Sequence, residues 1–104
     1  MPKHLWLITR SEDAVEQMRA LKPNERALLF AKIIELAQAE NPYSLPMVEK
    51  LGEPRFLHQR KIRQGDHRMR FEIIEGKVTE DKFDYKGKLH IISVTNRKDS
   101  YKRK

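Results

Sequence analysis

The segment RKIRQGDHRMRF, residues 60–71, constrains this chain more than any other because it is centred on Gly65-Asp66. Glycine at the first central position suits a two-residue turn between antiparallel strands. We therefore predict strands over residues 56–63 and 67–75, with Ile62 opposite Met69. A slip of one residue would move the apolar side chains to the other face, so their spacing also fixes the register.

This register sorts the side chains of the hairpin onto two faces. The apolar side chains share one face, which we expect to pack on the core: Ile62, Met69, Phe71 and Ile73. On the opposite face Lys61 lies across from Arg70. Arg63 likewise lies across from Arg68, so the two strands bring cations together in pairs.

Like charges directly opposite one another destabilise a sheet, by about 0.2–1 kcal/mol per pair. One interpretation is an exposed face on which Glu72 and solvent relieve the repulsion. The other is a preformed anion site whose repulsion is relieved when phosphate binds, because arginine offers phosphate two parallel hydrogen bonds and lysine a compact charge. We favour the anion site.

The distribution of charge along the chain supports an anionic partner. The net charge is +7, from 22 Lys and Arg against 15 Asp and Glu. Residues 1–50 carry equal numbers of basic and acidic side chains, so the whole excess lies in residues 51–104. A basic surface confined to part of a chain indicates an anionic partner, most commonly nucleic acid.

The composition also excludes several classes of protein. The absence of cysteine excludes disulfides and thiolate metal sites. The four histidines show no ligand spacing, so we expect no metal and no cofactor. No apolar run is long enough for a signal peptide or a membrane span, and we expect a cytoplasmic protein with no membrane partner.

The first half of the chain predicts a strand and two helices. Residues 4–9 are typical of a short strand, and Ser11 is a candidate N-cap for a helix over about residues 12–21. Pro23 suits the first turn of a second helix that stops before Pro42 and is apolar on most sides. Its Phe30 is expected in the core, as is Trp6 of the first strand.

The remaining segments complete the predicted fold. Residues 41–54 contain three prolines and predict a surface connector, residues 76–88 a polar loop, and residues 89–95 a last strand. The predicted fold is α+β, with an N-terminal strand, a helical hairpin and a three-stranded antiparallel meander that form one sheet with helices on one face. A length of 104 residues predicts a single domain, 1–104.

Two segments, KIRQGDHRMRFEI and LHIISVTNRKDSYK, resemble the C-terminal half of the RelE/ParE superfamily, the toxins of bacterial and archaeal type II toxin–antitoxin systems. The resemblance implies a RelE-like fold. In its RelE branch it implies a ribosome-dependent mRNA endonuclease without a metal, in which the ribose 2′-OH attacks the adjacent phosphate. Such chemistry needs cations on the phosphate oxygens and groups that move protons.

The resemblance also implies roles for individual residues. It assigns catalysis to four side chains: Lys61, Arg68, Arg97 and Tyr101. Contacts to RNA phosphate would come from four more: Arg63, Arg70, His67 and Lys98. Tyr101 would stack on a base, assist proton transfer or only pack the last turn. His67 is an alternative general base.

The resemblance leaves the branch of the superfamily open. A ParE-like toxin that binds and poisons DNA gyrase and an inactive RNA-binding relative are the alternatives to the nuclease. All three predict a cognate antitoxin that wraps the helices and covers the basic face, in a complex that can be of higher order. The nuclease further predicts the ribosome and mRNA as partners. Lysines of the 76–88 loop would contact ribosomal RNA or remain solvated: Lys82, Lys86 and Lys88.

Overall fold

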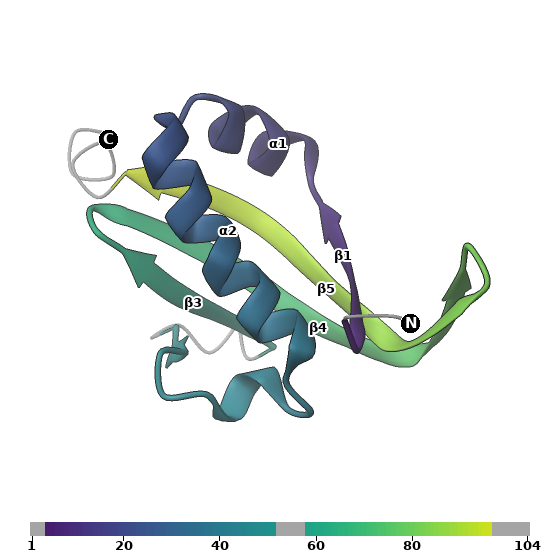
Figure 1. The fold of residues 1–104 in the computed structure, drawn as a ribbon. Coiled ribbons are helices and arrows are strands. Elements are labelled where there is room, and N and C mark those ends of the chain that lie inside the picture. The colour runs from purple at the N-terminus through teal and green to yellow at the C-terminus, as the bar shows by residue number, and fades with distance from the viewer. Residues whose placement is uncertain (1–3, 52–57, 97–104) are drawn as a thin grey trace.

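The computed structural model describes residues 4–51 and 58–96, and within these ranges the chain forms one five-stranded sheet with two helices on one face (Figure 1). The elements follow in the order β1 (Trp6–Arg10), α1 (Glu12–Arg19), α2 (Pro23–Gln38), a 3-10 turn (Pro42–Ser44), β2 (Glu49–Lys50), β3 (Gln59–Gln64), β4 (His67–Glu80) and β5 (Phe83–Asn96).

The strands lie in the order β1-β5-β4-β3-β2. β1 runs parallel to β5, and the other neighbours are antiparallel. The predicted α+β class, with helices on one face, is confirmed, and β2 is an additional strand within the predicted connector. In the described ranges no helix is long and apolar enough to cross a membrane.

The predicted register of the β3–β4 hairpin is confirmed. Ile62 lies opposite Met69, and Gly65 has φ +60°, which a side chain would disfavour and which suits the first position of the turn. The predicted core face is also confirmed: Ile62, Met69 and Phe71 are fully buried and Ile73 packs against the core. β3 begins at Gln59; residue 56 of the predicted strand lies outside the described residues.

Both helices begin where the sequence predicts. Ser11 Oγ accepts the Ala14 N–H at 3.0 Å, which satisfies a free donor of the first turn of α1. Pro23 opens α2. Helix α1 ends at Arg19 rather than near residue 21, with Ala20 as its C-cap, and α2 follows from Pro23.

The prediction that Phe30 lies in the core is wrong. α2 buries Leu29, Ile33, Leu36 and Ala37 against the sheet. Leu28 and Phe30 flank this stripe by about 100° on either side, and they stay 53% and 50% exposed. Trp6 is buried as predicted.

The prediction of a polar loop over residues 76–88 is also wrong. β4 continues to Glu80 and β5 begins at Phe83, so the two strands form a long hairpin whose end projects from the sheet (Figure 1). Asp81 and Lys82 form its turn with φ 51° and 69°. Gly76, which resembles a loop residue in the sequence, has φ 130° and lies where the β4–β5 register shifts.

Polar contacts across the strands hold the projecting end of this hairpin. The Thr79 hydroxyl donates to Asp84 Oδ1 at 2.7 Å, and Lys77 Nζ lies 3.6 Å from Asp84 Oδ2. The hydrogen bond from Thr79, with the charge of Lys77, lowers the pKa of Asp84. These contacts support a two-stranded segment that has little other packing.

Candidate nucleic-acid interface

The four cations of the β3–β4 hairpin lie on the sheet face that the helices leave open. We call this set, Lys61, Arg63, Arg68 and Arg70, the cationic face. In β3 and β4 its members alternate with the fully buried Ile62, Met69 and Phe71, which point toward the helices. Strand alternation therefore places the cations on the opposite side.

The predicted cross-strand cation pairs are present in the register. Arg63 pairs with Arg68, and Lys61 with Arg70. Lys32 of α2 donates to the Arg63 carbonyl at 2.8 Å, so a side chain of the helix layer holds the end of β3 that leads into the turn. The spacing of the cations is thus set by backbone pairing and does not depend on a loop.

The cations differ in their polar partners. Arg70 Nη2 donates to Gln59 Oε1 at 2.6 Å. Glu49 Oε1 lies 4.0 Å from Lys61 Nζ, and Glu49 Oε2 lies 3.8 Å from Arg63 Nε. Within residues 4–51 and 58–96, Arg68 has no hydrogen bond or ion pair of its side chain. Arg68 is therefore the cation of the face least engaged by the described part of the protein.

β5 extends this face with hydroxyl groups that sequence reasoning missed. Ser93 lies opposite Arg70, and Thr95 lies opposite Arg68. Ile92 is the extra residue where the register shifts between Arg70 and Phe71, and it reverses the alternation that Leu89 and Ile91 establish. Strict alternation from the buried Leu89 and Ile91 would therefore place Ser93 on the helix-covered face, whereas the structure places it opposite Arg70.

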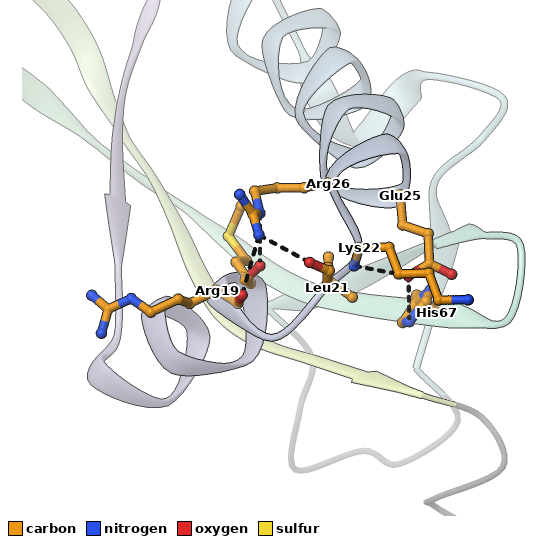
Figure 2. A network of polar contacts seen from close by, with 7 residues as sticks. Arg19, Leu21, Lys22, Glu25, Arg26 and His67 are labelled. Carbon is orange, nitrogen blue, oxygen red and sulfur yellow. Dashed lines mark hydrogen bonds and ion pairs between the residues drawn. The ribbon is translucent and has the colours of Figure 1, made fainter.

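His67 lies on the other side of the sheet from the cationic face. Its Nε2 is 4.0 Å from Glu25 Oε1 of α2, and its side chain is 13% exposed (Figure 2). The same Glu25 oxygen accepts the Lys22 N–H at 3.2 Å, which closes the start of α2. The described contacts thus tie His67 to the helix layer and do not bring it together with Lys61 or Arg68.

The arginine network in Figure 2 is structural. The Arg26 guanidinium donates to the carbonyls of Met18, Arg19 and Leu21 at 3.1, 3.2 and 2.9 Å. These carbonyls lie at and just beyond the end of α1, where few backbone N–H groups are left to bond them, although that of Met18 also accepts the Leu21 N–H at 3.2 Å. Arg26 therefore joins the end of α1 to the start of α2.

Three predicted site residues lie outside the described residues: Arg97, Lys98 and Tyr101. The last described residue of β5, Asn96, pairs with His67 at the turn end of the β3–β4 hairpin. In residues 4–51 and 58–96 no three His, Asp or Glu side chains gather into a group that could hold a metal ion.

A second surface feature is an apolar groove between the two helices. It has a volume of about 520 Å³, and a neighbouring hollow of about 260 Å³ shares Arg10, Met18 and Phe30 with it. The walls of the larger part come from α1, α2 and the end of β1: Arg10, Val15, Met18, Arg19, Pro23, Arg26, Ala27 and Phe30. Exposed Phe30 thus belongs to a concave apolar surface with arginines among its walls.

Comparison with solved structures places this fold in a known class. A chain of the RelB–RelE antitoxin–toxin complex from Methanococcus jannaschii superposes with a TM-score of 0.63 at 14% identity, over 90% of this chain and 95% of that chain. A chain of the RelBE2 toxin–antitoxin complex from Mycobacterium tuberculosis gives 0.62 at 16% identity, over 90% and 93%. No family model and no curated protein matches the sequence. The chain therefore has a RelE-like α+β fold, as its sequence motifs predict.

Proposed function

We propose that this protein is the toxin of a type II toxin–antitoxin pair and that it cleaves mRNA on the ribosome. The observation that carries the proposal is the cationic face, whose two like-charged pairs are fixed opposite one another by backbone register. Such pairs weaken the sheet and are useful when a phosphate lies between them. The RelE-like fold supports the proposal, since the two solved structures compared above come from toxin–antitoxin complexes.

The proposed reaction is a transfer within the RNA strand. The 2′-oxygen attacks the adjacent phosphorus, the bond from phosphorus to the 5′-oxygen breaks, and a cyclic phosphate remains. A base takes the proton of the 2′-hydroxyl, and an acid supplies a proton to the leaving 5′-oxygen. No redox step and no covalent enzyme intermediate are required.

The cationic face supplies the charge that this reaction needs. Negative charge on the phosphate oxygens increases in the transition state, and fixed cations there lower the barrier. Arg68 is suited to hold those oxygens because the described residues do not engage its guanidinium. Lys61 is 16% exposed and is held close to the sheet, where it can place one charge beside Arg68. Arg97 and Tyr101 would complete the site, with Tyr101 stacking on a nucleic-acid base or assisting proton transfer.

The partners follow from the same proposal. Ribosome-bound mRNA is the substrate, in the cytoplasm, and Arg63, Arg70 and Lys98 hold its backbone. A cognate antitoxin would cover the protein when it is inactive. The apolar groove with Phe30 fits an amphipathic segment, and the arginines among its walls favour acidic residues in that segment.

Expression of mutants in cells tests the proposal. Wild-type protein, the Arg68→Ala/Arg97→Ala double variant and the control Arg19→Ala are each expressed from a tightly repressed promoter. New 5′ ends are then mapped on a translated reporter mRNA. Arg19 is an exposed arginine of α1 that pairs with Glu16 at 3.6 Å, so the control removes a cation far from the cationic face.

The expected result is growth arrest with cuts in phase with codons for the wild type and the control, and neither for the double variant. Growth arrest with intact mRNA would refute the nuclease and point to a target such as DNA gyrase. Absence of both arrest and cuts with folded wild-type protein would leave an RNA-binding relative.

A further inference from the structure

An acidic side chain lies among the cations of the candidate interface. β2 consists of Glu49 and Lys50 only, and it pairs with β3 so that Glu49 lies directly opposite Lys61. The Glu49 carboxylate extends one oxygen toward Lys61 Nζ, at 4.0 Å, and the other toward Arg63 Nε, at 3.8 Å. One anion thus bridges two of the four cations.

Both ion pairs are loose. Charge-assisted hydrogen bonds have nitrogen–oxygen distances of about 2.7–2.9 Å, and both separations here are about 1 Å longer. Glu49 and Arg63 are each 47% exposed, so water and salt screen their attraction. The carboxylate is attracted to the cations, and within residues 4–51 and 58–96 it makes no closer polar contact. A ligand with a stronger charge and better geometry can therefore displace it.

We propose that Glu49 is an internal competitor for the phosphate site. In the free protein its carboxylate offsets part of the charge of Lys61 and Arg63, and a bound phosphate must displace it. This inference rests on the proposed function for one point, that the ligand of the cationic face is RNA phosphate.

The consequence is selectivity among polyanions. A ligand that reaches only Lys61 and Arg63 gains little, because it exchanges one anion for another. A strand that also engages Arg68 and Arg70 gains contacts that Glu49 does not oppose. Glu49 therefore weakens binding to arbitrary anionic surfaces and favours a strand that lies across the whole face.

Charge-matched variants test this role. Glu49→Gln keeps the size of the side chain and removes its charge, whereas Glu35→Gln makes the same change at an exposed position of α2. Glu49→Ala is a second variant, which removes the carboxylate without leaving an amide. The probe is a fluorescein-labelled single-stranded RNA with 2′-O-methyl groups, which cannot be cleaved by attack of the 2′-oxygen. Affinity is measured by fluorescence anisotropy at low and at physiological salt.

We expect both substitutions at Glu49 to tighten RNA binding roughly threefold to tenfold relative to Glu35→Gln at low salt. The difference should shrink as salt rises, because salt screens exposed charges. Equal affinities for Glu49→Gln and Glu35→Gln would overturn the inference, since net charge alone would then explain the effect. Loss of mRNA cleavage with unchanged RNA affinity would also overturn it, because Glu49 would then act as a base.

Arg68→Ala separates failure of this inference from failure of the proposed function. If this variant binds the probe as tightly as the wild type, the cationic face is not the phosphate site and the proposed function fails. If Arg68→Ala loses affinity while the two Glu→Gln variants remain equal, the role of Glu49 alone is refuted. Thermal melting of each variant verifies that it is folded.

Discussion

Replacing Arg68 by Gln should make the protein more stable and less functional. Arg68 lies directly opposite Arg63, and within the described residues its side chain makes no compensating hydrogen bond or ion pair. Gln keeps much of the aliphatic length of Arg and removes the charge. The substitution therefore isolates the repulsion between the two strands.

The expected gain follows from the pairing of like charges across a sheet. Relief of one such pair is worth about 0.2–1 kcal/mol. For a domain of this size that corresponds to a rise in Tm of roughly 1–8 °C. The gain should be largest at low salt and should fade as the Debye length falls below the separation of the charges.

The assay is thermal unfolding followed by circular dichroism at low and at high salt, with Arg26→Gln as the matched control. Arg26 donates to three carbonyls at the end of α1, so its loss should lower the free energy of unfolding by about 1–2 kcal/mol. The change from Arg to Gln should thus raise Tm at position 68 and lower Tm at position 26. A fall in Tm for Arg68→Gln at low salt would refute the electrostatic argument.

Two further substitutions test the packing of the sheet. Tyr43→Phe should lower the free energy of unfolding in urea by about 1–3 kcal/mol, because the Tyr43 hydroxyl accepts the Ile73 N–H at 2.9 Å and donates to the His58 carbonyl. Burial raises the pKa of Tyr43 above its usual 10.0. The stability that the neutral hydroxyl contributes is therefore fully present below pH 10 and is lost as pH rises through the higher pKa of the folded state. The Phe variant should lack this loss of stability at alkaline pH. Gly87→Ala should lower the free energy of unfolding by about 1–3 kcal/mol and lower Tm with it. The reason is steric, since a Cβ there would come within 2.2 Å of the β4 backbone and 2.9 Å of the Trp6 ring. An unchanged Tm for Gly87→Ala, or equal stability of Tyr43→Phe and the wild type at neutral pH, would contradict these packing arguments.

The sequence predicts the β3–β4 hairpin well because two independent signals agree there. Gly65 suits the turn, and the spacing of Ile62 and Met69 demands the same register. The end of the β4–β5 hairpin has no such agreement. Its turn places Asp81 and Lys82 at positive φ, where Lys is uncommon, and Gly76 indicates a loop although it lies within a strand.

The candidate interface likewise contains residues whose placement the sequence predicts and one whose placement it does not. Alternation predicts that Lys61 and Arg68 share a face, because alternation depends only on the regular backbone of a strand. Glu49 could not be predicted as their neighbour. A two-residue strand has too few positions to show a period, and it lies between prolines of a connector. Contacts made through short edge strands depend on tertiary packing that local patterns do not record.

The parallel pairing of β1 with β5 has a consequence for the synthesis of the protein. β5 lies between β1 and β4, so β1, which is synthesised before the other strands of the sheet, pairs with β5, which is synthesised after them. Contacts between such distant segments form late, after the loop between them has closed. A ribosome that translates this chain must therefore have made β5 before the five-stranded sheet can be complete. Translation itself thus delays completion of the sheet that carries the cationic face until β5 has been made.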